Sequence, residues 1–223
     1  MATLTTREDT DLIAHALAAP PETRSVAAFV PGPGIARLSL RFDIARLQEA
    51  LDICLDRQGY MGDMQAEGFA ALPLTQRPGQ TEWTENDLSG RYWLRPDETY
   101  EEVPREDLVP EAAFSEFNPA FRGTYFEEVI ATLKAQFPIG RTRILSKAVY
   151  NCNSWHRDPE PRLHIPIRTN PGAIFIVNHH ATHLPADGSV YFTDTRGYHT
   201  ALNGGEYRRV HLVAALAYEQ VQT

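Results

Sequence analysis

The pattern of apolar and polar positions divides the chain into a helical first half and a β-rich second half. Between Ala36 and Phe42 apolar and polar residues alternate, which predicts a strand. Asp43 then stands at the N-cap position of a helix with an apolar face formed by Ile44, Leu47, Leu51, Cys54 and Leu55. Similar spacing predicts a short helix around Asp11–Leu17 and an amphipathic helix over Gly123–Phe137, which ends before a proline.

After Gly140 the apolar period changes to two, and no further helix is predicted. The candidate strands are Arg143–Tyr150, Leu163–Thr169, Ala173–Asn178, Ser189–Thr193 and Arg209–Ala217. Turn residues (Pro, Gly, Asn and Asp) separate these segments. Short strands separated by such turn residues indicate a sandwich or a jelly-roll barrel, so the expected fold is mostly β with N-terminal helices.

The 223 residues fit one domain with an N-terminal extension. We interpret residues 1–34 as the extension, because they end in a Pro-Gly-Pro-Gly stretch, and residues 35–223 as the domain. Within it, residues 35–139 supply helical support and a substrate region, and residues 140–217 supply the core barrel. The irregular part at 84–122 is the expected lid or substrate wall, because long loops in compact domains are often functional.

Composition narrows the class of protein only slightly. With 43% hydrophobic and 22% charged residues the chain resembles ordinary globular proteins. Its net charge of -8 argues against nucleic acid as a partner, since phosphate binding requires a surplus of Lys and Arg. The chain has two cysteines and no apolar run of the roughly 20 residues that cross a bilayer, so we expect a soluble cytoplasmic protein without a membrane partner.

Apolar and polar residues alternate along the segment Arg162–Arg168. Leu163, Ile165 and Ile167 alternate with polar and cationic residues. Alternate side chains of a strand point to opposite faces, so Arg162 and His164 share one side. A polar inner face in a small barrel indicates a bound ligand.

Three residues match a metal-ligand pattern. Non-haem iron(II) oxygenases hold the metal with two histidines and one carboxylate, which leave positions open for co-substrate and oxygen. His156 and Asp158 form a His-x-Asp pair, and His199 supplies the distant histidine. The pair alone is weak, because chance gives about 0.4 such pairs in this composition. Arg209, ten residues after His199, adds a guanidinium suited to the distal carboxylate of 2-oxoglutarate.

These residues and their neighbours resemble motifs of the bacterial proline hydroxylases and the aspartyl/asparaginyl β-hydroxylases. The similar blocks follow the family order over residues 140–217, with a weaker likeness at 35–60. They are Gly140-Arg141-Thr142-Arg143, Trp155-His156-Arg157-Asp158, Arg162-Leu163-His164-Ile165-Pro166-Ile167 with Thr169-Asn170-Pro171, Gly188 to Asp194, His199 to Asn203, and Arg208 to Leu212. The chain departs from the family at Ser189 and Tyr191, where the family has Glu and Trp, and it lacks the C-terminal helical domain of some proline hydroxylases.

The resemblance implies a double-stranded β-helix, iron(II) as the metal, and 2-oxoglutarate and O2 as co-substrates. It implies hydroxylation of an amino acid, free and proline-like or within a peptide, with release of succinate and CO2. The metal ligands would be His156, Asp158 and His199, and 2-oxoglutarate would contact Arg209, Arg162 and His164. The amino acid or peptide would meet Arg141, Arg143, Trp93 and Arg95.

Other interpretations remain open at this stage. The chain is alternatively a non-catalytic barrel that binds a small acid or a metal, or an oxygenase that catalyses desaturation, epoxidation or ring closure. If Asp158 were not a ligand, His164 and His199 would form a site without a carboxylate. The residues His179, His180 and His183 suggest zinc, but their turn-like surroundings favour a solvent-exposed loop.

Overall fold

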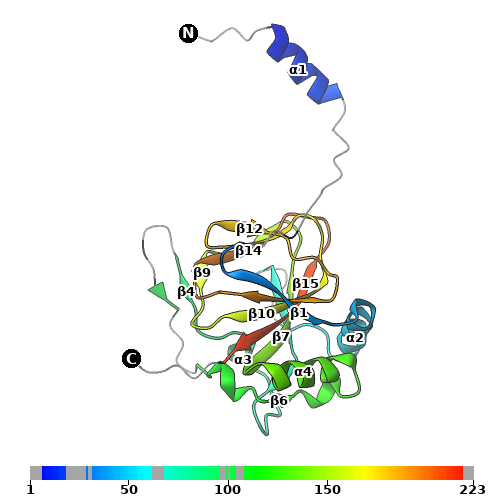
Figure 1. The fold of residues 1–223 in the computed structure, drawn as a ribbon, viewed down its shortest axis with the longest axis vertical. Helices are drawn as coiled ribbons and strands as arrows, with labels where there is room; N and C mark the ends of the chain where they lie inside the picture. The colour runs from blue at the N-terminus through cyan, green and yellow to red at the C-terminus, as the bar shows by residue number, and fades with distance from the viewer. Residues whose placement is uncertain are drawn as a thin grey trace.

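Two antiparallel sheets face each other, and helices cover the outer side of the larger one (Figure 1). The computed structural model describes residues 7–18, 29, 32–61, 68–95, 99, 101–103 and 108–217. The larger sheet has the order β1 (Ile35–Arg41), β13 (Ser189–Thr193), β10 (Arg162–Arg168), β15 (Arg209–Leu216), β7 (Ile139–Lys147) and β2 (Phe69–Pro73).

The smaller sheet has the order β12 (His180–Thr182), β11 (Ala173–Val177), β14 (His199–Asn203), β9 (His156–Arg157), β4 (Trp93–Leu94) and β5 (Glu101–Glu102), with β8 (Asn151–Cys152) also paired to β14. A separate pair joins β3 (Thr75–Gln76) to β6 (Glu116–Phe117). The helices are α1 (Arg7–Ala18), α2 (Ile44–Arg57), α3 (Glu85–Leu88) and α4 (Tyr125–Gln136), with 3-10 turns η1 (Glu111–Ala113) and η2 (Pro119–Phe121).

The larger sheet is apolar on the face that meets helices α2 and α4. Leu163, Ile165 and Ile167 of β10 are buried there in one cluster with the apolar faces of both helices. Asp43 caps α2 as expected, because its side chain accepts from the backbone N–H groups of Ala45 and Arg46. The apolar surface is thus buried between the sheet and the helices, so the opposite face of the sheet is available for polar side chains.

The space between the two sheets contains a mixture of apolar and charged residues. A small apolar cluster of Ile35, Phe175, Val177, Leu184, Tyr191 and Ala201 fills one part. Arg162 and His164 of β10 point into the remaining part, on the side opposite to Leu163. Their expected shared orientation is confirmed, and the polar inner face belongs to the interior of the barrel.

The expected class, a mostly β double-stranded β-helix with N-terminal helices, is confirmed. Helices α1, α2 and α4 and five of the strands lie close to their predicted ranges. In the core barrel, β14 and the short strands β8, β9 and β12 were not predicted, and β7 begins at Ile139 rather than Arg143. The division at residue 34 stays a prediction. Phe29, from the predicted extension, packs against Tyr191 with ring centroids 5.0 Å apart.

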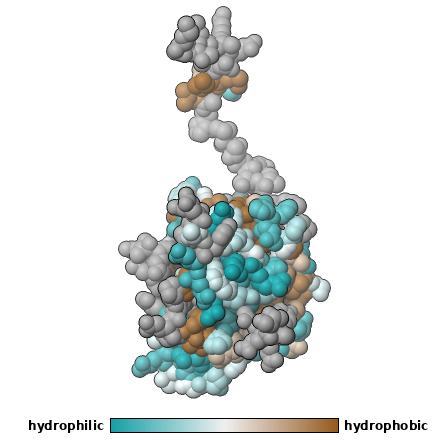
Figure 2. Space-filling model, turned by 90° about the vertical axis from the view of Figure 1, so that its left-hand side faces the viewer, coloured by the Kyte–Doolittle hydropathy of each residue, from teal (hydrophilic) through white to brown (hydrophobic). Residues whose placement is uncertain are grey.

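Helix α1 carries exposed apolar side chains, in contrast to the barrel. Leu12, Ile13 and Leu17 are all exposed. Figure 2 shows brown hydrophobic residues on this helix and a mainly hydrophilic face on the barrel below it. Within the described residues, no helix has both the length and the apolar character needed to cross a membrane.

Replacement of Gly188 tests how closely the chain packs where β1 meets β13. Gly188 has a φ of +84°, and an added Cβ would overlap the carbonyl oxygen of Phe42. Gly79 has a similar φ of +72° but nothing within 4 Å of such a Cβ, which makes it the matched control. We expect Gly79→Ala to cost roughly 1–2 kcal/mol from backbone strain alone, and Gly188→Ala to cost about 1–3 kcal/mol more from overpacking. Urea unfolding measures both, and equal losses would contradict the close contact.

Candidate metal centre

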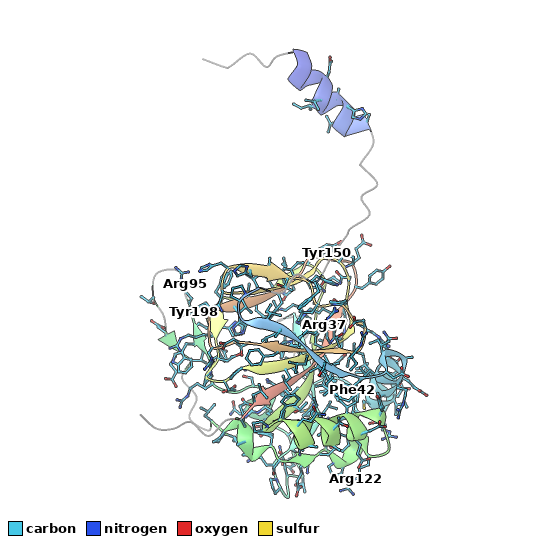
Figure 3. The ribbon with its side chains drawn as sticks, viewed as in Figure 1. Arg37, Phe42, Arg95, Arg122, Tyr150 and Tyr198 are labelled. Atoms are coloured by element: carbon cyan, nitrogen blue, oxygen red, sulfur yellow. The ribbon has the colours of Figure 1, made fainter. Side chains whose placement is uncertain are left out.

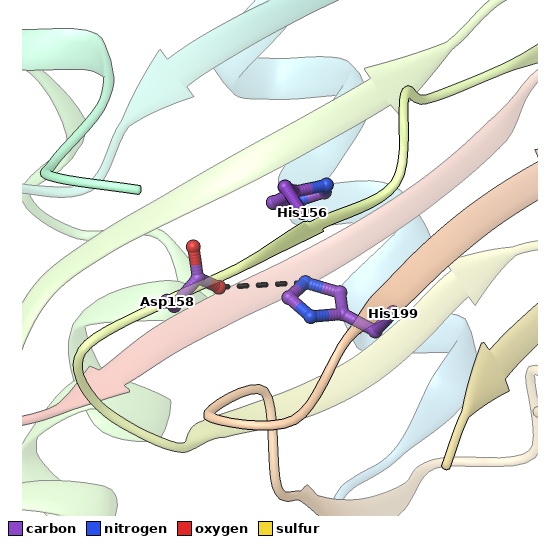
Figure 4. A group of neighbouring side chains, drawn as sticks. All are labelled: His156, Asp158 and His199. Atoms are coloured by element: carbon purple, nitrogen blue, oxygen red, sulfur yellow. Dashed lines mark ion pairs between the residues drawn. The ribbon is translucent and has the colours of Figure 1, made fainter. Parts of the chain in front are cut away.

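The two histidines and the carboxylate of the predicted metal site lie together between neighbouring strands (Figure 4). His156 of β9 is directly opposite His199 of β14 in the antiparallel register. Asp158 follows two residues after His156, and its backbone N–H donates to the carbonyl of Thr195 at 2.8 Å. One ligand atom from each side chain lies within 4.8 Å of the others. The structure therefore brings the three predicted ligands together.

Backbone carbonyls fix the orientation of both imidazoles. Nδ1 of His156 lies 2.7 Å from the carbonyl oxygen of Ser154, and Nδ1 of His199 lies 3.1 Å from that of Gly197. A carbonyl oxygen only accepts, so each Nδ1 carries the proton and each Nε2 of the neutral ring is bare. Burial lowers the pKa of His199 to about 4, despite the opposing effect of Asp158, and burial also lowers the pKa of His156. Both rings are thus neutral at pH 7, the form that binds metals.

Two hydrogen-bond acceptors consequently face each other across the site. Nε2 of His199 lies 3.5 Å from Oδ2 of Asp158, and Figure 4 marks this contact. Oδ2 is buried and has no hydrogen-bond partner among the described residues. A bare imidazole nitrogen and a carboxylate oxygen repel each other unless a cation lies between them. The side chains therefore fit a divalent metal held by two histidines and one carboxylate, the ligand set of non-haem iron(II) enzymes.

Arg162 pairs with two acids beside the candidate metal site. Its Nε is 3.0 Å from Oδ2 of Asp158, and its Nη2 is 3.7 Å from Oε1 of Glu160. The contact with Asp158 is an ion pair without the angles of a hydrogen bond. The guanidinium also lines the cavity beside the histidines. Its role in binding 2-oxoglutarate stays a prediction, because two acids already balance its charge.

A cavity of about 50 Å³ adjoins His156 and His199 and receives side chains from both sheets. Its polar lining includes Lys147, His156, Arg162, His164, His199 and Arg209. Phe175 of β11 separates the rings of His164 and His199, at centroid distances of 5.1 and 5.7 Å. The predicted co-substrate residues Arg209, Arg162 and His164 therefore line the same cavity as two of the predicted metal ligands, His156 and His199.

Arg209 has neutral partners in this cavity. Its Nη2 donates to Nδ1 of His211 at 3.0 Å, and Nδ1 of His164 lies 3.4 Å from the same atom. Nε2 of His164 is buried without a hydrogen-bond partner among the described residues. Burial lowers the pKa of Arg209 to about 10 and holds the pKa of His164 and of His211 well below 6.5. A charged guanidinium beside two neutral imidazoles suits an incoming carboxylate.

The predicted substrate residues on β7 are engaged elsewhere in the protein. Arg141 is fully buried, pairs with Glu111 at 3.2 Å and donates to the carbonyl of Val109 at 2.8 Å. Arg143 donates to the carbonyl of Leu88, and burial lowers its pKa to about 9. Both arginines thus fasten Leu88 and the 109–111 segment to the barrel. Their binding of a substrate carboxylate stays a prediction.

Trp93 and Arg95 lie beside the strand that carries His156. Strand β4 pairs with β9, so that Leu94 is opposite His156 and Trp93 is opposite Arg157. The Arg157 guanidinium lies 4.1 Å from the centroid of the Trp93 indole. Arg95 is exposed at the same side of the molecule as Tyr198 (Figure 3). The substrate contacts expected of Trp93 and Arg95 stay predictions, and this edge of the smaller sheet is where they would form.

Lys147, which is buried in the cavity, and His211, which accepts from Arg209, were not among the predicted site residues. Lys147 follows Arg141 and Arg143 at alternate positions of β7, and His211 follows Arg209 in the same way on β15. This alternation is the signal that pointed to Arg162 and His164. On β7 the signal is interrupted, because Leu145 stands between Arg143 and Lys147 on the same face.

The cluster of three further histidines is only partly the solvent-exposed loop that was expected. His179 and His180 are exposed, and residues 178–179 form a turn with positive φ. Residues His180–Thr182, however, form β12. His183 is buried, with Nδ1 2.9 Å from the carbonyl oxygen of Ala173. Its ring is thus part of the packed sheet.

Comparison with known proteins gives similarity of fold only. No protein-family model and no curated protein matches the sequence. The solved structures that it resembles include an oxidoreductase of the 2OG-Fe(II) oxygenase family from Burkholderia pseudomallei (16% identity, 82% of this chain and 83% of that chain, TM-score 0.48). Others are the viral collagen prolyl hydroxylase of Paramecium Bursaria Chlorella virus-1 (8%, 82% and 96%, 0.44) and the DMSP lyase DddQ from Ruegeria pomeroyi (14%, 97% and 90%, 0.35).

Removal of the carboxylate tests the metal site directly. We expect Asp158→Ala to weaken the binding of iron(II) by at least about 100-fold, since even residues behind the ligands contribute roughly 10- to 100-fold. Anaerobic calorimetric titration measures the affinity. Asp52→Ala removes an exposed acid that pairs with Arg168 and should leave the affinity unchanged. Equal affinities in the two variants would remove Asp158 from the ligand set.

The buried neutral imidazoles predict a loss of stability in acid. The pKa of His211 is lowered on folding, so the unfolded chain takes up the proton first as the pH falls through about 6.5. Its contribution to stability is complete above that pH and lost below it. When the pH of the metal-free protein is lowered from 7.5 to 5.5, the free energy of unfolding of His211→Gln should fall by about 1.4 kcal/mol less than that of wild type.

Urea unfolding at the two pH values measures this difference. The control, His15→Gln, changes an exposed histidine of α1 and should follow the wild-type profile. If His211→Gln also followed that profile, His211 would not be buried in its neutral form.

Proposed function

We propose that this chain is an iron(II)- and 2-oxoglutarate-dependent oxygenase that hydroxylates an amino acid, either free or within a peptide. The observation that carries the proposal is the contact between two acceptors, Nε2 of His199 and Oδ2 of Asp158, at 3.5 Å. A buried arrangement of this kind is favourable with a cation between the two atoms. The ligand set of two histidines and one carboxylate favours iron(II) among the divalent metals.

The side chains have separate tasks in this proposal. His156, Asp158 and His199 hold the metal. Arg209 binds the distal carboxylate of 2-oxoglutarate, because its guanidinium faces the cavity without an acid to balance it. His164 lines the same cavity and would contact the co-substrate with its neutral ring. When bound, iron(II) with 2-oxoglutarate and O2 supplies the oxidising chemistry, in which the 2-oxo acid becomes succinate and CO2.

The protein around the metal orients the substrate and limits the access of water. Strand β4 supplies the wall next to His156, and Tyr92 meets the imidazole edge to face at a centroid distance of 5.9 Å. Aromatic and arginine side chains here suit the backbone and carboxylate of an amino acid. An oriented C–H bond is what such a site contributes, since positioning supplies a large part of the rate. The same geometry serves desaturation or ring closure, which differ in the substrate held.

The test is the visible spectrum of the anaerobic iron(II) protein with 2-oxoglutarate, followed by succinate formation in air. We expect a metal-to-ligand charge-transfer band in wild type. Arg209→Met should raise the 2-oxoglutarate concentration needed for the band by roughly 10- to 100-fold, because a hydrogen bond to a charged group contributes about 1.5–3 kcal/mol. Arg196→Met, which removes an exposed guanidinium paired with Asp194, is the matched control.

Succinate separates the oxygenase from a non-catalytic binding protein. An oxygenase forms succinate when amino acids and peptides are supplied, and the accepted substrate gains one oxygen atom in mass. Folded wild-type protein that gives neither a band nor succinate would refute the proposal and favour a barrel that only binds small acids or metals.

A further inference from the structure

Lys147 is buried in the same cavity as Arg209. The two residues are directly opposite each other in the register of β7 and β15. Their exposed fractions are 3% and 5%. Both side chains line the cavity that adjoins His156 and His199. Two cations from neighbouring strands thus enter one small space beside the metal ligands.

Neither of these two cations is balanced by an acid. Nζ of Lys147 donates to Oδ1 of Asn151 at 2.9 Å, and Arg209 donates to His211 at 3.0 Å, so both partners are neutral. Among the described residues, no carboxylate oxygen lies within 4.0 Å of either cation. By contrast, the buried guanidinium of Arg162 pairs with Asp158 and Glu160.

Placing like charges together without an acid is unfavourable in a protein interior. The pKa of Lys147 is lowered to about 8, first by burial and then by the charge of Arg209. An anion between Lys147 and Arg209 offsets their mutual repulsion and gives each buried cation an oppositely charged partner. The chain therefore contains a site with two cations for one carboxylate, whose two oxygens can each take one of them.

We propose that Lys147 is the second cation for the distal carboxylate of 2-oxoglutarate and selects a dicarboxylic 2-oxo acid over a monocarboxylic one. This inference rests on the proposed function, which already assigns Arg209 to that carboxylate. Arg209 supplies the planar guanidinium and Lys147 a compact ammonium group, so the carboxylate is held from two neighbouring strands.

The test compares two acids of equal chain length. Calorimetry with zinc(II)-loaded protein measures the affinity for 2-oxoglutarate and for 2-oxopentanoate, which lacks the distal carboxylate. We expect Lys147→Met to weaken the binding of 2-oxoglutarate at least tenfold, because loss of a charged hydrogen bond costs about 1.5–3 kcal/mol. The affinity for 2-oxopentanoate should stay nearly unchanged. Lys147→Arg should keep the preference. Lys134→Met, which changes the only other lysine of the chain, should behave like wild type.

A second measurement observes Lys147 itself. Because the chain has two lysines, protein labelled with ¹³C at the lysine ε-carbon gives two signals, and Lys134→Met identifies that of Lys147. Its titration should have a midpoint near the pKa of about 8. Addition of 2-oxoglutarate should raise this midpoint, and 2-oxopentanoate should not. A lysine with a merely structural role would titrate alike with both acids.

The outcomes separate the inference from the function beneath it. If metal-loaded wild type does not bind 2-oxoglutarate, the proposed function fails, and the inference fails with it. If wild type binds it, but Lys147→Met keeps the full preference for 2-oxoglutarate, the function stands and the role of Lys147 is overturned. If Lys147→Met does not fold, the signal of Lys147 decides, and a midpoint unmoved by 2-oxoglutarate overturns the inference.

Discussion

The six-stranded sheet must satisfy two opposite environments at once, and the site depends on how it does so. The faces of β7, β10 and β15 toward α2 and α4 are apolar and bury the main hydrophobic cluster. The apolar surface buried between the sheet and these helices stabilises the fold. The inner faces of the same strands can therefore carry charged groups. Strand alternation enforces the separation residue by residue. A metal and an anionic co-substrate can thus be accommodated in the interior without loss of the hydrophobic core.

Charge balance inside the barrel then divides the buried cations into two kinds. Arg141 and Arg162 are paired with carboxylates and contribute to the architecture, Arg141 by holding Glu111 and Arg162 by contacting Asp158. Arg209 and Lys147 have neutral partners only, as does Arg143, which bonds to the carbonyl of Leu88 and does not line the cavity. Buried charges normally require compensation. The two cations of the cavity, Arg209 and Lys147, are thus where the proposed ligands would complete the interior.

Buried side chains add to the backbone pairing of β4 and β6 in holding the irregular region that borders the site. Arg141 and Arg143 of β7 donate to the carbonyls of Val109 and Leu88. The backbone of η1 also comes so close to Gly140 that an added Cβ would overlap the carbonyl of Glu111. A guanidinium with five donors can satisfy several carbonyls of a loop. These parts of the predicted substrate wall are thereby joined to β7, the strand that also carries Lys147.

The sequence determined the features that depend on local geometry. Alternation along 162–168 fixed which side chains share a face, Asp43 capped its helix, and the spacing of His156 and Asp158 aimed two ligands to one side. Strand β14 escaped prediction because His199–Asn203 is a short segment without a strong alternation, and the true start of β7 was hidden beside Pro138 and Gly140. Only the tertiary structure decided which cations have acids beside them and which imidazole nitrogens are bare. Those properties depend on distances between residues far apart in the chain, such as Lys147 and Arg209, and no periodicity in the sequence encodes such distances.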